Sequence, residues 1–156
     1  MVRDRHDPDG PFRERRLESR QMTRYFDIDA ANAALVEVAP MLATLADQRR
    51  ELIMLRDRTL AVGVPDGPDN TVPDPEEARR LRLRMQGVID QMAAAVARID
   101  AMGITLRDIE SGLIDFPALV TGRQVWLCWR LGESEVTTWH ELDSGFGGRQ
   151  ALADLV

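Results

Sequence analysis

The residues best suited to chemistry lie close together near the C-terminal end of the chain. His140, one of two histidines, is followed within nine residues by Glu141, Asp143 and Arg149. A histidine that is oriented by a neighbouring carboxylate can act as a general base. The same imidazole, combined with carboxylate oxygens, can hold a divalent metal ion. We therefore identify His140 and Asp143 as the candidate catalytic residues and as the candidate ligands of a divalent metal, the one cofactor that the sequence indicates.

Other charged residues around this segment are suited to binding a small ligand. The planar fork of an arginine matches a carboxylate or a phosphate, on the protein or on a ligand. The candidate ligand-binding residues are Arg149, Glu141, Asp115, Glu110 and Arg130. Three interpretations remain open: a structural network in which Arg149 pairs with Asp143 or Asp115, ligand binding without chemistry, and catalysis.

Cys128 is the only cysteine of the chain. If a hairpin closes at Glu133 and Ser134, counting back from its turn pairs Cys128 with Trp139 and places His140 opposite Leu127. Because neighbouring side chains of a strand alternate between faces, Cys128 and His140 are then expected on opposite faces. This arrangement excludes a Cys–His nucleophile pair. Cys128 is predicted to be a small buried hydrophobe.

Known motifs give little help in choosing between these interpretations. The sequence contains no Gly-x-Ser-x-Gly elbow, no Walker loop and no dinucleotide fingerprint. A structural zinc site needs three or four His and Cys ligands. Beyond the N-terminal region the chain has one of each, so structural zinc is not expected.

Two long amphipathic helices are predicted ahead of this segment. The first covers 27–62, with Asp27 as its N-cap and a kink near Pro40, where a backbone hydrogen bond is missing. The second covers 75–102, where Asp74 is the N-cap, Pro75 takes the first position and Glu77 completes a capping box. Its apolar residues recur in an unbroken heptad pattern typical of a coiled coil or bundle: Leu81, Met85, Val88, Met92, Ala95, Ile99 and Met102.

The hydrophobic period changes from helical to alternating after the second helix. The segment 104–140 predicts strands that include 104–107, 113–120, 124–131 and 136–140. Pro117 indicates that the second of these strands, 113–120, lies at an edge of the sheet or contains a bulge. A glycine-rich loop over 141–149 follows. The predicted fold class is α+β: a long antiparallel helical hairpin, kinked near Pro40, followed by a small antiparallel β-sheet of three to four strands.

The domain organisation follows from composition. Residues 1–22 form a charged, disordered N-terminal tail. Residues 23–150 form a single α+β domain, interrupted by a loop over 63–75 that is rich in proline and glycine. Residues 151–156 are a C-terminal tail.

Charge and composition exclude some classes of partner. A net charge of −6 argues against nucleic-acid binding, which needs clustered positive charge. No apolar run approaches the ~18 residues of a membrane helix, and 1–20 lacks the apolar stretch of a secretory signal. A single cysteine fits a reducing cytoplasm. Two helices that each bury one stripe leave apolar surface uncovered, which predicts a homodimer that packs as a four-helix bundle.

Several stretches resemble a known family. These are 112–117 (GLIDFP), 128–133 (CWRLGE) and 139–149 (WHELDSGFGGR), together with Tyr25-Phe26 and 31–35 (ANAAL). They are similar to the bacterial and archaeal family of domain of unknown function 2203, over about residues 24–150. The resemblance implies a small cytosolic protein with a helical hairpin followed by a β segment. It implies no activity.

The favoured functional interpretation is a non-catalytic binding or regulatory module. It oligomerises through its helices and carries a polar pocket for a small ligand around His140, Asp143 and Arg149. The alternative is a small enzyme of the hydrolase or lyase type that uses His140 with a carboxylate or a divalent metal. Whether the protein is an enzyme stays open.

Overall fold

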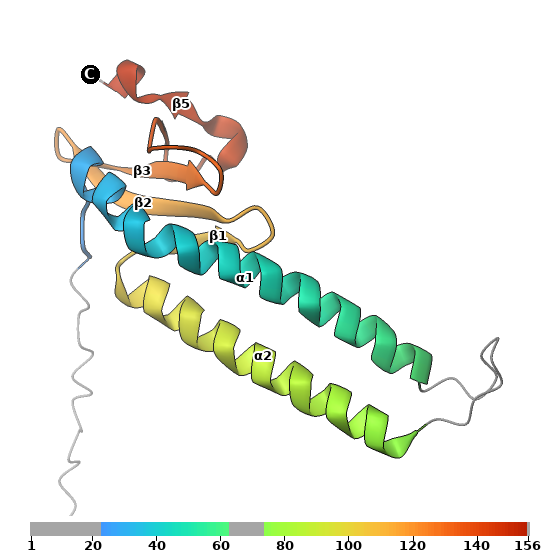
Figure 1. The fold of residues 1–156 in the computed structure, drawn as a ribbon. Coiled ribbons are helices and arrows are strands. Elements are labelled where there is room, and N and C mark those ends of the chain that lie inside the picture. The colour runs from blue at the N-terminus through green and yellow to red at the C-terminus, as the bar shows by residue number, and fades with distance from the viewer. Residues whose placement is uncertain (1–22, 63–73, 156) are drawn as a thin grey trace, which may run out of the picture.

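The computed structural model describes residues 23–62 and 74–155, and the predicted N-terminal tail and nearly all of the predicted 63–75 loop lie outside the described residues. Two helices, α1 (Ile28–Val62) and α2 (Pro75–Ala101), precede a five-stranded antiparallel sheet with the strand order β1-β2-β3-β4-β5. The helices form a long hairpin, and the sheet lies at the end of it where α1 begins (Figure 1). The predicted α+β class is confirmed.

Both helices begin at the predicted residues. The Asp27 carboxylate accepts a hydrogen bond from the Ala30 N–H at 2.7 Å, and Asp74 accepts one from the Glu76 N–H at 2.9 Å. These bonds satisfy N–H groups that have no partner inside the helix. The predicted capping box is wrong, because the Glu77 carboxylate instead accepts from Arg58 Nε at 2.9 Å. Glu77 therefore joins the two helices.

The apolar heptad residues of α2 form a stripe that packs against other parts of the same chain. Leu81, Val88 and Ile99 of this stripe are buried, and the α2 stripe continues toward the sheet with Met92, Ala95 and Met102 packed on the main core. The buried residues of α1 all lie between Ala31 and Ala46. Past this point α1 extends beyond the sheet beside α2 (Figure 1).

The sheet contains one strand more than the upper bound of the prediction. Its strands are β1 (Thr105–Asp108), β2 (Leu113–Val120), β3 (Arg123–Arg130), β4 (Thr138–His140) and β5 (Gln150–Ala151). Two short 3-10 helices, η1 (Phe146–Gly148) and η2 (Leu152–Leu155), flank β5. A strand of two residues carries no periodic pattern, so sequence alone did not reveal β5.

The interpretation of Pro117 as marking an edge or bulged strand is wrong. Strand β2 lies between β1 and β3, and Pro117 pairs in regular register with Trp126. The Pro117 carbonyl accepts from the Phe26 N–H at 2.7 Å. The paired part of β1 reaches only to Thr105, opposite Asp115. The missing N–H of Pro117 thus falls beyond the end of β1, where no strand needs it.

The two faces of the sheet have different roles. One face packs on the helices and forms the main core, with Ile114, Phe116, Ala118, Val125, Leu127, Trp129 and Trp139. The opposite face carries Asp115, Cys128 and His140, and the segment 141–149, which we call the covering segment, lies over it. The sheet is thereby enclosed between α1 and the C-terminal part of the chain (Figure 1).

By length and composition alone, α1 is the one helix in the described part of the chain that would be long and apolar enough to cross a membrane. This is weak evidence, because the core helix of a globular protein passes the same test. Ala31, Leu35, Val38 and Leu42 of α1 are buried in the core beneath the sheet.

Candidate functional site

The register between β3 and β4 differs from the predicted one. Trp126 pairs with His140, Leu127 with Trp139, and Cys128 with Thr138. The predicted register is therefore wrong by one residue. Since side chains alternate along a strand, this single step moves Cys128 and His140 from opposite faces to the same face.

The connection between β3 and β4 explains the error. The chain does not turn tightly at Glu133 and Ser134 but forms a longer loop over 131–137. Glu133 closes a small turn, because its N–H donates to the Arg130 carbonyl at 3.0 Å and its carboxylate accepts from the Arg130 N–H at 2.9 Å. The Val136 N–H then donates to Asn32 Oδ1 of α1 at 2.7 Å. This long-range bond, which no local pattern reveals, holds the return of the chain.

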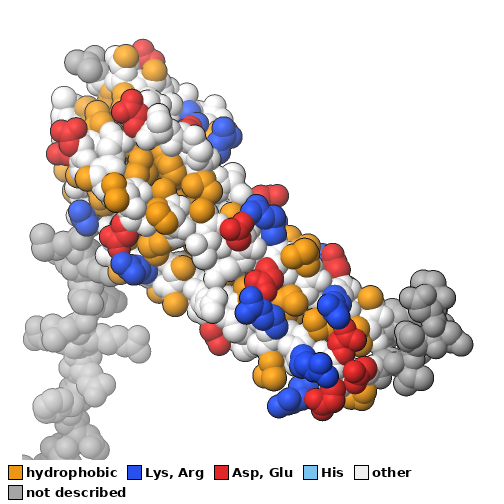
Figure 2. Space-filling model, viewed as in Figure 1, with side chains coloured by type: hydrophobic (Ala, Val, Ile, Leu, Met, Phe, Trp, Pro, Cys, Tyr) orange, Lys and Arg blue, Asp and Glu red, His pale blue; other side chains and the backbone are white. Residues whose placement is uncertain are grey.

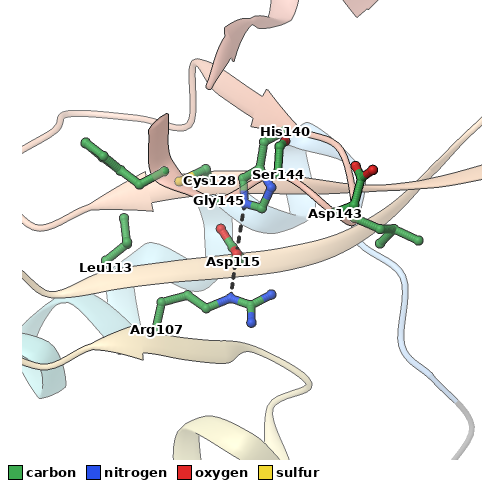
Figure 3. Close-up of a pocket in the computed structure, with 10 residues that line it drawn as sticks. Arg107, Leu113, Asp115, Cys128, His140, Asp143, Ser144 and Gly145 are labelled. Atoms are coloured by element: carbon green, nitrogen blue, oxygen red, sulfur yellow. Dashed lines mark hydrogen bonds and ion pairs between the residues drawn. The ribbon is translucent and has the colours of Figure 1, made fainter. Parts of the chain in front are cut away.

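Three side chains converge on the covered face of the sheet. One ligand-type atom from each of Asp115, Cys128 and His140 lies within 4.8 Å of the others, and all three residues are buried. Asp115 pairs directly with Cys128 across β2 and β3. Figure 3 shows the Asp115 carboxylate between His140 and Arg107. The three residues line a pocket of about 350 Å³, whose other wall is 142–146 of the covering segment.

The hydrogen bonds of His140 engage both of its ring nitrogens. Its Nδ1 lies 2.8 Å from the Glu141 carbonyl oxygen, and its Nε2 lies 2.9 Å from Asp115 Oδ2. A carbonyl and a carboxylate both accept hydrogen bonds, whereas a neutral imidazole has one N–H to donate. When Nδ1 donates to the carbonyl, the Nε2 lone pair faces a carboxylate oxygen. When Nε2 carries the N–H instead, it donates to Asp115; in the first arrangement Nε2 is available as a metal ligand.

Asp115 is held from its other side by Arg107. The Arg107 Nε donates to Asp115 Oδ2 at 2.7 Å, and its guanidinium lies 4.9 Å from the centre of the Trp126 ring. The second oxygen, Oδ1, is buried and has no partner in the described part of the chain. A buried carboxylate oxygen without a partner is unusual. Oδ1 is thus a buried acceptor that has no donor within the described residues.

The thiol of Cys128 is not an activated nucleophile. Burial raises its pKa from 9.0 to about 12, the negative charge of Asp115 adds to the rise, and Arg149 opposes it. Because the thiolate is the reactive form, a thiol with this pKa is inert near neutral pH without a metal. A bound metal ion changes this, because a coordinating thiol loses its proton.

The structure brings only some of the predicted site residues together. Asp115 and His140 are in direct contact, and Asp143 lines the same pocket as an exposed side chain. Two predicted ligand-binding carboxylates are engaged elsewhere: Glu141 pairs with Arg123 at 2.6 Å, and Glu110 pairs with Arg49 at 3.2 Å. The predicted pairing of His140 with Asp143 thus gives way to a pairing of His140 with Asp115.

The two arginines among the candidates lie around Phe146. Arg149 pairs with Glu133 at 2.6 Å, so the predicted structural pairing with Asp143 or Asp115 is wrong. Its guanidinium lies 4.7 Å from the centre of the Phe146 ring, and that of Arg130 lies 5.3 Å away. Arg149 therefore anchors the covering segment to the β3–β4 loop.

Sequence reasoning missed two residues of the site: Cys128 of the cluster, and Arg107, which lines the same pocket. Cys128 was excluded by the wrong register. Arg107 was included only as the last residue of the predicted strand 104–107, in which apolar and polar residues alternate. That alternation was a usable signal, because it places Arg107 on the face of the sheet that the core does not occupy.

The fold and the cluster define a small α+β protein with a buried polar site of mixed Asp, Cys and His chemistry. The chain belongs to the family described as uncharacterized conserved protein (DUF2203), whose model matches residues 24–152. A search of curated proteins gave no match. A search of solved structures gave none either.

Proposed function

We propose that this protein is a binding module that holds one divalent metal ion, zinc, through Asp115, Cys128 and His140. The observation that carries the proposal is the convergence of three buried ligand-type atoms, one each from Asp115, Cys128 and His140, within 4.8 Å of one another. A metal ion there would accept the Nε2 lone pair, while Nδ1–H keeps its bond to the Glu141 carbonyl. A ligating histidine nearly always donates its other N–H in this way, which fixes the ring.

The kinds of ligand and their separations support zinc. Thiolate and imidazole favour zinc over magnesium or calcium, which prefer oxygen ligands. Around a tetrahedral zinc with bonds of roughly 2.0–2.3 Å, ligand atoms are about 3–4 Å apart. In the cluster the Nε2–Oδ2 separation is 2.9 Å and all separations are within 4.8 Å, so these two limits bracket that range. Small side-chain shifts would therefore suffice for coordination.

Cobalt substitution tests the proposal directly. Purified protein titrated with Co²⁺ is expected to show thiolate-to-cobalt charge-transfer absorption in the near ultraviolet, with one metal bound per chain. Because Cys128 is the only cysteine, this absorption can arise from no other residue of the chain. Cys128→Ser should abolish the absorption, and His140→Ala should weaken Co²⁺ binding by at least tenfold, as the loss of one of three ligands implies.

Asp143→Asn is the matched control for the cobalt titration. Asp143 lines the pocket but is exposed and does not belong to the cluster. This variant should bind Co²⁺ like the wild type. Wild-type protein without charge-transfer absorption, or a Cys128→Ser variant that retains it, would contradict the proposal.

A small zinc hydrolase is the second candidate function. Three protein ligands leave a fourth position open, which is the arrangement of catalytic zinc sites. A zinc ion held there would supply a bound water as the nucleophile, with His140 as one of its ligands and Asp143 as the candidate general base at the pocket. Asp143→Asn separates the two functions: it leaves metal binding intact in both, and it reduces turnover only in the enzyme.

We also propose that the protein forms a homodimer through the part of the hairpin that extends beyond the sheet. Met54 and Leu60 of α1 and Leu83 of α2 are largely exposed there. Figure 2 shows hydrophobic side chains among charged ones over this part of the surface. A second hairpin that packs on it, as in a four-helix bundle, would cover these side chains.

Light scattering during size-exclusion chromatography tests the dimer. The wild-type protein should elute with twice the mass of the chain at micromolar concentration, and Leu83→Glu should shift it to the monomer, because a charge is buried at the interface. Val36→Glu is the control, since Val36 is 82% exposed and lies between the core residues Leu35 and Val38 of α1. A monomeric wild type would rule out the dimer.

A further inference from the structure

We infer that the pocket beside the cluster binds a small oxyanion, a carboxylate or a phosphate, between the metal ion and Arg107. The inference rests on the proposed metal site and names the class of ligand that would occupy its open position. Three features support it: the unused donors of Arg107, the charge of the loaded site, and the size and lining of the pocket.

Arg107 is positioned in the way that anion recognition requires. Its Nε is bound to Asp115 Oδ2, and its guanidinium packs over the Trp126 ring, so both its position and its plane are fixed. Neither terminal nitrogen makes a hydrogen bond within residues 23–62 and 74–155, and the Arg107 side chain is 41% exposed. Two parallel N–H donors at the end of a fixed guanidinium match two oxygens of one anion.

The charge of the loaded site favours an anion. A divalent ion is neutralised by the thiolate of Cys128 and the carboxylate of Asp115, while Arg107 adds about one positive charge next to them. Asp143 is the other charged side chain that lines the pocket, and it is exposed to solvent. A single negative charge at the fourth metal position would therefore leave the buried part of the site neutral.

The pocket limits the size of this anion. Its volume of about 350 Å³ is at the small end of the range for ligand sites, which begins near 300 Å³. Besides the charged residues, its lining includes the hydroxyl of Ser144 and three apolar side chains, Leu113, Leu142 and Phe146. These apolar residues suit a short hydrocarbon substituent on the anion. The expected ligand class is a small organic acid or phosphate ester.

The test titrates the cobalt-loaded protein separately with inorganic phosphate and with acetate. Anion binding at the open position should change the visible d–d spectrum, and the anion with the lower Kd identifies the headgroup. Arg107→Gln should raise that Kd about tenfold, as expected for the loss of a charge-assisted pair. Arg107→Lys, which keeps the charge but not the planar fork, should raise it less. Arg123→Gln is the control, because Arg123 pairs with Glu141 and is not part of the pocket lining.

The two proposals fail in different ways. If the wild-type protein shows no charge-transfer absorption when it is titrated with Co²⁺, the metal site is refuted. Absorption that is present, with a d–d spectrum that neither anion changes, would refute the oxyanion inference and leave the metal site in place. An unchanged Kd in both Arg107 variants would also overturn the inference, because the anion would then bind without the arginine.

Discussion

Asp115→Ala is expected to lower the free energy of unfolding of the metal-free protein by about 3 kcal/mol. Asp115 is 1% exposed, and Oδ2 is the partner of both Arg107 and His140. Alanine leaves the Arg107 Nε without its acceptor and creates a cavity beneath the covering segment. For a domain of this size the melting temperature should fall by roughly 10 °C. Chemical denaturation of chelator-treated protein measures the change.

Asp115→Asn separates the structural role of this residue from its proposed metal binding. The amide oxygen can still accept from Arg107, and the amide nitrogen can donate to the Nε2 lone pair of His140. Stability should therefore stay within about 1 kcal/mol of the wild type. Cobalt affinity should fall sharply, because an anionic ligand is lost. An alanine variant as stable as the wild type would show that the Asp115 network does not stabilise the fold.

Gly112→Ala is expected to have an effect of similar or larger size through the backbone. Gly112 has φ of +63°, and a Cβ built on it would lie 2.6 Å from the Cβ of Leu131. The Leu131 N–H also donates to the Gly112 carbonyl at 3.0 Å, so the two segments cannot separate without losing this bond. We expect a loss of about 3 kcal/mol or more, as for overpacking in a core. Thermal unfolding, or the yield of folded protein, measures it.

Gly122→Ala is the matched control for Gly112→Ala. Gly122 also has a positive φ, +79°, but a Cβ there meets no atom within 4 Å. Only the left-handed backbone conformation opposes the substitution, at about 1–2 kcal/mol. Equal losses in the two variants would mean that the contact with Leu131 has no effect and that backbone conformation alone determines the result.

The elements that could be predicted from the sequence are those whose formation depends on residues close together in the chain. The caps at Asp27 and Asp74 and the apolar periods of both helices are local signals, and the structure shows them at the predicted positions. Strand β3 was predicted from its alternation to within one residue at each end. In contrast, β5 consists of two residues and is defined only by its pairing with β4.

The candidate site was harder to predict, because it depends on the register in which β3 and β4 pair. His140 and Asp115 were both identified from their residue types, but their contact spans three strands and follows from no spacing in the sequence. Cys128 was assigned to the wrong face of the sheet. The length of the loop between β3 and β4 sets the register of these strands, and the register decides on which face each side chain lies. That length is fixed here by the bond between Val136 and Asn32, residues far apart in the chain.

The attachment of β5 has a consequence for access to the pocket. The covering segment continues into β5, which is joined to the rest of the sheet by its short pairing with β4, by a bond from the Trp139 indole N–H to the Ala151 carbonyl, and by one from the Leu152 N–H to the Thr137 carbonyl. The segment is also held by the ion pair between Arg149 and Glu133, and releasing all these contacts leaves the pairing of β1 to β4 intact. The segment therefore acts as a separate unit of local unfolding, with a lower opening free energy than the core. Amide protons of 150–152 should exchange with solvent before those of β2 and β3.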